Sequence, residues 1–278
     1  MELNWFEALI YGIVSGLTEF LPVSSSAHQA LMLKLFGSAS AGNLLTLLVH
    51  LSILLALFSD RSQYIEQLRR NQRLATIPKQ RRKRQPDLTH LLEMKMLKTA
   101  VIPLLISFIF YPNFRQWDNN LLWISVFLIV NGVLLFMPLL VRNGNKDARS
   151  MTGLDSLLLG ICSALAGLPG ISRIGAVSSA AVARGADKEH ALNWALLICI
   201  PGLACYVGFD LFAIVTGGIG PFGVLTLIGC LLACVGSFFA SRFAIRTMRS
   251  FARRMGFSGF CYYCWGVALF SFIMYLSI

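Results

Sequence analysis

The stretch GLTEFLPVSSSAH at residues 16–28 brings a carboxylate, a proline, three consecutive serines and a histidine together between two apolar segments. A proline removes a helix hydrogen bond and clashes with the preceding turn. We therefore expect the apolar run at 5–36 to break near Pro22 into two half-length helices. A second run, at 154–184, carries a similar break in LPGISRIG at 168–175, so the sequence predicts two such helix pairs.

The chain is far more apolar than a soluble domain. Of its 278 residues, 56% are hydrophobic and 13% are charged, and the mean hydropathy is +0.68, whereas about 25% of the residues of a soluble domain are charged. We therefore predict an all-α polytopic membrane protein. Crossing a bilayer takes about 20 helical residues, so the broken runs at 5–36 and 154–184 are interpreted as re-entrant pairs that enter and leave on one side.

Six further apolar segments are predicted to span the membrane as helices. The first two are short, and we expect them to extend into the polar residues beside them. The six segments lie at 44–59, 99–111, 120–141, 190–215, 221–241 and 259–278.

The two halves of the chain resemble each other. LIYGIVSGL at 9–17 aligns with LLLGICSAL at 157–165, and each motif is followed by a proline and then a serine. The repeats are predicted to cover 1–141 and 142–278, each with one re-entrant pair and three spanning helices. Because three is an odd number, the second repeat must enter the membrane inverted relative to the first.

Lysine and arginine are distributed unevenly, and this distribution predicts the orientation. The formal net charge is +11, and 11 of the 24 Lys and Arg residues lie in the polar segment 60–98. If that segment is a cytoplasmic loop, the predicted cytoplasmic segments hold 21 of the 24, whereas the outer segments hold only Lys34 and Arg115. This bias follows the positive-inside rule, places both termini outside, and explains the charge without a nucleic-acid partner. The other cytoplasmic segments are 142–153, 184–189 and 242–258.

Broken helices in an inverted repeat place a binding site where the breaks meet, near the middle of the bilayer. Helix N-termini and hydroxyl donors favour an anion, and a guanidinium matches phosphate oxygens. The predicted ligand is therefore a phosphate group inside the membrane. The side chains expected to meet are Glu19, Ser24, Ser25, Ser26 and His28 from the first break and Ser172 and Arg173 from the second.

The same residues allow plainer interpretations. An ion pair between Arg173 and Glu19 could simply hold the breaks together, although that leaves the serines without a role. A serine at a helix start is more often a cap than a nucleophile. His28 lies within one turn of Ser25, where it could bond a serine or act as a structural donor. His50, in a spanning segment, could line the cavity or bond the backbone, and we favour the cavity.

GLTEFLPVSSSAH, together with PGISRIGA at 169–176, resembles the signature pair of the bacterial undecaprenyl-diphosphate phosphatases of the bacitracin-resistance type. The resemblance covers essentially the whole chain. It implies a bacterial plasma-membrane enzyme that removes the terminal phosphate of the C55 isoprenoid diphosphate and returns the carrier to peptidoglycan synthesis. It also implies a site open to the outer face and a divalent cation, Mg²⁺ or Ca²⁺. The implied partners are the polyprenyl diphosphate and the bilayer, and a homodimer is compatible with the sequence.

Residue by residue, the resemblance implies that Glu19 is an acidic residue needed for activity and for the metal, and that Ser25 is the nucleophile. It makes His28 the motif histidine and Arg173 the residue that holds the diphosphate. The hydroxylic contacts to substrate would be Ser24 and Ser172, and the serine cluster adds Ser26. Either Glu19 or His28 could take the proton of Ser25, and direct attack by water remains an alternative.

One position departs from the family pattern. The family usually carries a second glutamate four residues before the first, and this chain has Ser15 there. Two glutamates at i and i+4 would share a helix face and could hold one cation together. Ser15 therefore leaves two alternatives open, a transporter of prenyl phosphate that hydrolyses nothing and a family member with weakened catalysis.

Overall fold

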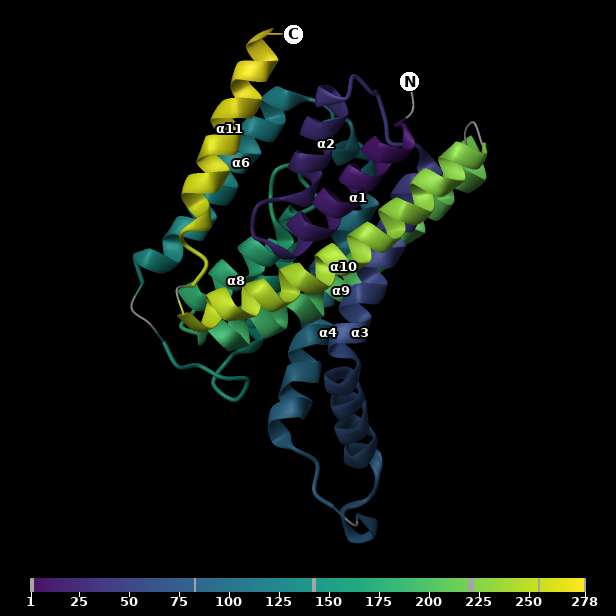
Figure 1. The fold of residues 1–278 in the computed structure, drawn as a ribbon. Coiled ribbons are helices and arrows are strands. Elements are labelled where there is room, and N and C mark those ends of the chain that lie inside the picture. The colour runs from purple at the N-terminus through teal and green to yellow at the C-terminus, as the bar shows by residue number, and fades with distance from the viewer. Residues whose placement is uncertain (1–2, 83, 142–143, 220–222, 255, 278) are drawn as a thin grey trace.

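The computed structural model of the chain describes residues 3–82, 84–141, 144–219, 223–254 and 256–277, without the side chains at 111, 115 and 254. The predicted boundaries at 142, 221 and 278 and two of the basic residues counted above, Lys83 and Arg142, lie outside this part of the chain. Within it the regular elements are helices (Figure 1), as predicted: α1 (Trp5–Phe20), α2 (Ser25–Leu35), α3 (Asn43–Thr76), η1 (Lys79–Arg81), α4 (Leu88–Ile109), α5 (Tyr111–Arg115), α6 (Leu121–Phe136), η2 (Met137–Leu139), α7 (Gly153–Leu165), α8 (Arg173–Ala183), α9 (Lys188–Gly217), α10 (Val224–Arg254) and α11 (Phe260–Ser277).

Among the described residues, five helices are long and apolar enough to cross a membrane: α3, α6 with η2, α9, α10 and α11. They match five of the six predicted spans, and the chain is a multi-pass membrane protein. The sixth prediction, 99–111, falls in α4, which is not among the five. From residue 99 onward α4 provides only about 16 Å of apolar helix, because Glu93, Lys95 and Lys98 occupy its first half.

The segment 60–98, predicted to connect two spans as a cytoplasmic loop, is helical over most of its length. Helix α3 continues to Thr76 and α4 begins at Leu88, so the two helices form a hairpin that projects from the rest of the molecule (Figure 1). No glycine or proline interrupts 60–76, so nothing in the sequence stops the helix there. Asp87 caps α4 by accepting a hydrogen bond from the Thr89 amide at 2.9 Å, and this bond lowers the pKa of Asp87.

Both predicted breaks are present. Helix α1 ends at Phe20, and α2 begins at Ser25 after a turn in which Ser24 has a φ of 69°. Few non-glycine residues adopt a positive φ, so the turn holds Ser24 in an uncommon backbone conformation. Helix α7 ends at Leu165, and α8 begins at Arg173.

Small residues bring the helices close together. Gly12 and Gly16 of α1 lie against the backbone of Ala233 and Ser237 of α10, with no room for a Cβ. Such small-xxx-small spacing lets helix backbones approach closely in membranes. Gly160 of α7, which the repeat aligns with Gly12, lies in the same way against α4.

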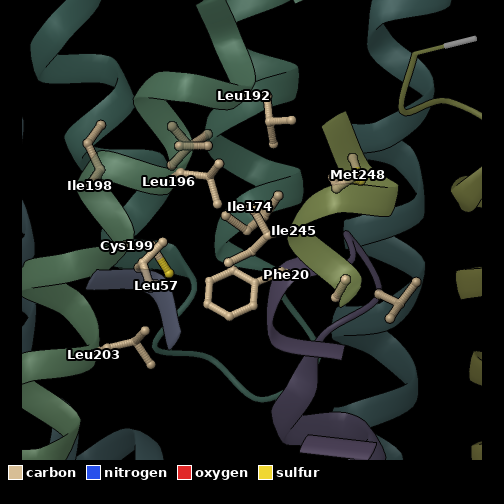
Figure 2. Packing of buried hydrophobic residues seen from close by; sticks show 14 of the residues in the cluster. Phe20, Leu57, Ile174, Leu192, Leu196, Ile198, Cys199, Leu203, Ile245 and Met248 are labelled. Atoms are coloured by element: carbon tan, nitrogen blue, oxygen red, sulfur yellow. The ribbon is translucent and has the colours of Figure 1, made fainter. Parts of the chain in front are cut away.

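The core lies directly beneath the first break. The Phe20 ring is fully buried and is surrounded by side chains from α3, α8, α9 and α10 (Figure 2), among them Leu57, Ile174, Cys199 and Ile245. The last residue of α1 therefore anchors the first break to helices of both halves of the chain.

Candidate active site

A cavity of about 230 Å³ lies where the two breaks meet. Helices α3 and α9 complete its wall. The cavity contains six of the eight predicted site residues, Glu19, Ser25, Ser26, His50, Ser172 and Arg173. The structure therefore brings together the acid, the hydroxyls and the guanidinium singled out in the sequence.

Arg173 is 5% exposed and faces several groups. Its Nη1 lies 3.7 Å from Glu19 Oε1 and 4.0 Å from the sulfur of Cys199. The Tyr206 ring lies 4.9 Å from its Cζ, which is a cation–π contact. Among the described residues its Nε is buried and has no hydrogen-bond partner, so the guanidinium can still donate to a ligand.

The close packing of Arg173 depends on Gly202 of α9. A Cβ on Gly202 would lie 2.7 Å from Cζ of Arg173. The absence of a side chain at Gly202 therefore provides the space that the guanidinium occupies.

Ser25 belongs to a hydrogen-bonded network that includes Ser15. The Ser25 hydroxyl donates to the Ser15 carbonyl oxygen at 3.3 Å. Gln29 Nε2 donates to Ser25 Oγ at 3.3 Å and to Ser15 Oγ at 3.1 Å. Gln29 lines the cavity and was not predicted, although its position one turn after Ser25 was a signal in the sequence.

Hydrogen bonds join the two breaks. The Gly170 amide donates to Ser26 Oγ at 3.3 Å, and the Ser172 hydroxyl donates to the Leu21 carbonyl oxygen at 3.3 Å. Ser172 also caps α8, because its Oγ accepts from the Gly175 amide at 3.2 Å. Each break therefore holds the other in place.

Ser24 and His28 do not line the cavity. Ser24 caps α2, with its Oγ 3.5 Å from the Ala27 amide. His28 Nδ1 lies 2.8 Å from the Ser24 carbonyl oxygen, so Nδ1 carries the proton, and Nε2 accepts from the Tyr263 hydroxyl at 2.8 Å. Neither nitrogen is bonded to a serine hydroxyl, so the arrangement favours the structural interpretation of His28.

His50 lines the cavity, as predicted from its place in a spanning segment. Its Nδ1 lies 2.6 Å from Asp210 Oδ2, and its ring stacks on Tyr206 at 5.6 Å between centroids. Tyr206 in turn covers Arg173. Asp210 and Tyr206 were not predicted as site residues, because only the fold brings α9 beside α3.

The residues suited to a divalent cation are few. Among the described residues, no group of three or more His, Cys, Asp or Glu side chains could hold a metal ion. Glu19 supplies one carboxylate beside the hydroxyls of the first break. Such a donor set fits a hard cation only if substrate oxygens or water complete the shell.

Comparison with known proteins shows the family of the chain. A family model described as "Bacitracin resistance protein BacA" matches residues 8–270. The undecaprenyl-diphosphatase of Alkaliphilus metalliredigens is 33% identical over 265 residues, which cover 94% of this chain and 95% of that protein. The undecaprenyl-diphosphatase of Carboxydothermus hydrogenoformans is 30% identical, over 95% and 94% of the two chains. Undecaprenyl-diphosphatase 3 of Bacillus cereus is 29% identical, over 96% of each chain. The chain therefore belongs to the BacA family of bacitracin resistance proteins.

Proposed function

We propose that the protein hydrolyses undecaprenyl diphosphate to undecaprenyl phosphate and inorganic phosphate within the membrane, and that this activity recycles the carrier lipid and confers bacitracin resistance. The observation that carries the proposal is the shared cavity, in which Arg173 of the second break lies 3.7 Å from Glu19 of the first. A cation at membrane depth is costly unless it is paired or functional. An ion pair between Arg173 and Glu19 alone would leave the serine hydroxyls that also line the cavity without a role, whereas a bound phosphate group would use them.

The diphosphate would lie between the breaks, with the prenyl tail among the helices. Helices α2 and α8 both begin at the cavity, and their N-termini carry free N–H groups and the positive end of the helix dipole. Arg173 would donate its free Nε–H, and Ser172 and Ser26 would add hydroxyl contacts. These groups suit the phosphate oxygens and the leaving monophosphate, whose charge grows in the transition state.

Ser25 Oγ would attack the terminal phosphorus, and the bond to the bridging oxygen would break as undecaprenyl phosphate leaves. Glu19, one turn from Ser15 on the same face of α1, would take the hydroxyl proton. Water would then attack the phosphorus of the phosphoserine, the bond from phosphorus to Ser25 Oγ would break, Glu19 would return its proton to Ser25, and hydrogen phosphate would leave. Direct attack by water, with Ser25 binding a phosphate oxygen, uses the same residues.

Glu19 is the residue we propose for a divalent cation, Mg²⁺ or Ca²⁺, with phosphate oxygens as further ligands. When bound, such a cation would neutralise the phosphate charge and polarise the phosphorus. Gln29 occupies the space beside Ser15, where the family places its second carboxylate. This chain would therefore bind the cation more weakly than a relative with two glutamates.

We also propose the inverted repeat with two re-entrant pairs, the termini and the cavity facing outward. The packing supports this arrangement: α1 packs on α10 as α7 packs on α4, α3 packs on its counterpart α9, and α6 packs on α11. The start of α1 and the end of α11 lie at one end of the molecule, and the α3–α4 hairpin projects at the other (Figure 1). The 21 Lys and Arg residues of the predicted cytoplasmic segments fit this orientation.

The direct test is phosphate release from undecaprenyl diphosphate in detergent, with Mg²⁺ or Ca²⁺. Arg173→Ala should abolish release, whereas Lys34→Ala, which removes a cation outside the cavity, should leave it within twofold. Near-normal turnover of Arg173→Ala would contradict the proposal.

Ser15 favours a second candidate, a transporter that moves prenyl phosphate without hydrolysis. If the protein is such a transporter, it should move prenyl phosphate across the membrane of proteoliposomes and release no phosphate. Phosphate release without lipid movement would eliminate it.

A further inference from the structure

A second polar cavity, of about 320 Å³, lies at the far end of the helices that line the first. On α3 it is reached at Asp60 and Arg61, about 16 Å along the helix from His50. On α9 it is reached at Glu189 and Asn193, with Glu189 about 31 Å along that helix from Asp210. It is therefore separate from the proposed active site.

This cavity contains more positive than negative charge. The carboxylate of Asp60 is approached by three guanidinium groups: Arg61 Nε at 3.1 Å and Arg249 Nη2 from the lining of the cavity, and Arg242 Nη1 at 3.8 Å from outside it. The side chains of Asp60 and Arg61 are only 8% and 6% exposed. One carboxylate thus faces three cations.

The neighbouring acidic residues do not remove the excess. Glu189 is paired with Arg253 through Nε and Oε1, so that pair is neutral. Glu93 accepts a hydrogen bond from the Tyr64 hydroxyl and lines a different, smaller cavity. The lining of the cavity itself carries three guanidinium groups, Arg61, Arg249 and Arg253, against the two carboxylates of Asp60 and Glu189.

A simple structural ion pair would need one cation for Asp60. Two further guanidinium groups, partly withdrawn from water, repel each other and lose hydration, so a bound anion would stabilise them. A guanidinium group can bind a phosphate through two parallel N–H···O hydrogen bonds. Asn193 Oδ1 accepts a hydrogen bond from Arg61 Nη1 at 2.9 Å, and this bond fixes the orientation of the Arg61 guanidinium.

The cavity lies where the apolar part of the surrounding helices ends. The apolar part of α3 ends just before Asp60, with Phe58 exposed, and Phe243 of α10 is exposed two turns before Arg249. These apolar side chains would face lipid tails, so the cavity would lie at headgroup depth. Its volume is at the lower end of the roughly 300–1,000 Å³ of ligand pockets, which suits one phosphate group.

We propose that this cavity binds a phosphate group through Arg61, Arg249 and Arg253, presented either by an anionic lipid headgroup or by free phosphate. The proposal does not depend on the hydrolytic activity. It assigns the protein an anion site at the membrane face opposite the proposed active site.

The test is calorimetric titration of the whole protein in maltoside detergent, once with short-chain phosphatidylglycerol and once with inorganic phosphate. Arg249→Gln should weaken binding at least tenfold. The matched control is Arg246→Gln, which removes the same charge from the same helix outside the cavity, and it should change affinity less than twofold. Arg173→Ala should leave this binding intact, which separates it from phosphate bound in the active site.

Phosphatidylglycerol binding alone would identify a headgroup site, and binding of both ligands would identify a general phosphate site. If Arg249→Gln does not fold, Arg253→Gln decides, because that side chain is 67% exposed and its loss should still weaken binding severalfold. Equal losses in Arg246→Gln and Arg249→Gln, or no binding of either ligand by the unmodified protein, would overturn the proposal.

Discussion

Gln29 is the residue that most changes the interpretation of Ser15. A serine is too short to reach where a glutamate carboxylate would lie, and the Gln29 amide, coming from the next helix, bonds to it at 3.1 Å. The amide also bonds to Ser25. The neutral amide of Gln29 on α2 thus occupies the space where the family pattern places a glutamate carboxylate of α1.

Gln29→Leu should lower kcat about 3- to 10-fold and change KM less than twofold. A decrease of this size corresponds to the loss of one hydrogen bond, the one from Gln29 to Ser25. The reason is that Ser25 loses the donor that orients its hydroxyl, while Arg173 still binds the diphosphate. Steady-state phosphate release measures both constants. A change confined to KM would show that Gln29 contacts substrate instead.

Ser15→Glu should tighten Mg²⁺ or Ca²⁺ binding by adding a second carboxylate one turn from Glu19. The effect should be largest in Ser15→Glu/Gln29→Leu, where the amide no longer occupies the space. Cation affinity measured by calorimetry without substrate provides a readout independent of turnover. Unchanged affinity in both variants would mean that Glu19 is not a ligand.

Gly202→Ala should raise KM at least tenfold, because its Cβ would lie 2.7 Å from the Arg173 guanidinium and displace it. Gly208→Ala is the matched control on the same helix, since a Cβ there meets nothing within 4 Å. Phosphate release measured at varied substrate concentration gives the KM of each of the two variants. Equal behaviour of the two variants would contradict the role assigned to Gly202.

The sequence predicted the cavity residues that carry charge or hydroxyl groups at the breaks, such as Glu19, Ser25 and Arg173. It did not predict the environment of His28. The partner of that ring is Tyr263, 235 residues away, and no local spacing reveals a contact of that kind.

At the scale of elements, α1 and α10 pack closely because of Gly12 and Gly16. Gly16→Val should destabilise the folded protein by about 1–3 kcal/mol, the usual cost of overpacking, because a side chain there would collide with Ser237 of α10. Thermal unfolding in detergent measures the effect. Gly266→Val is the control, since α11 has open space at that position.

The helix breaks were predictable because proline and glycine act locally, whereas the length of the α3–α4 hairpin was not. The polar composition of 60–76 gives no sign of where α3 ends, and this stretch contains no helix breaker. Polarity indicates exposure to water, and it does not exclude a helix in water. The absence of Gly and Pro from 60–76 is the feature of the sequence that agrees with a continuous helix.

The orientation of the protein in the bilayer can be tested by proteolysis. Trypsin should cut the basic tip of the hairpin, near Arg81 and Arg82, in inside-out vesicles and leave it intact in spheroplasts. The reason is the positive-inside bias together with the exposure of that tip. Cleavage in spheroplasts alone would mean that the protein is oriented the other way.

The hydrogen bond from the Gly170 amide to Ser26 links positions 144 residues apart, and this has a consequence for biosynthesis. The first helix pair inserts early, yet its partner is still untranslated. At about 5–20 residues per second, the ribosome needs roughly 7–30 s to supply the second pair. During that interval the nascent chain must keep its serines hydrated or shielded by the insertion machinery, so the enzyme cannot become competent before its second half emerges.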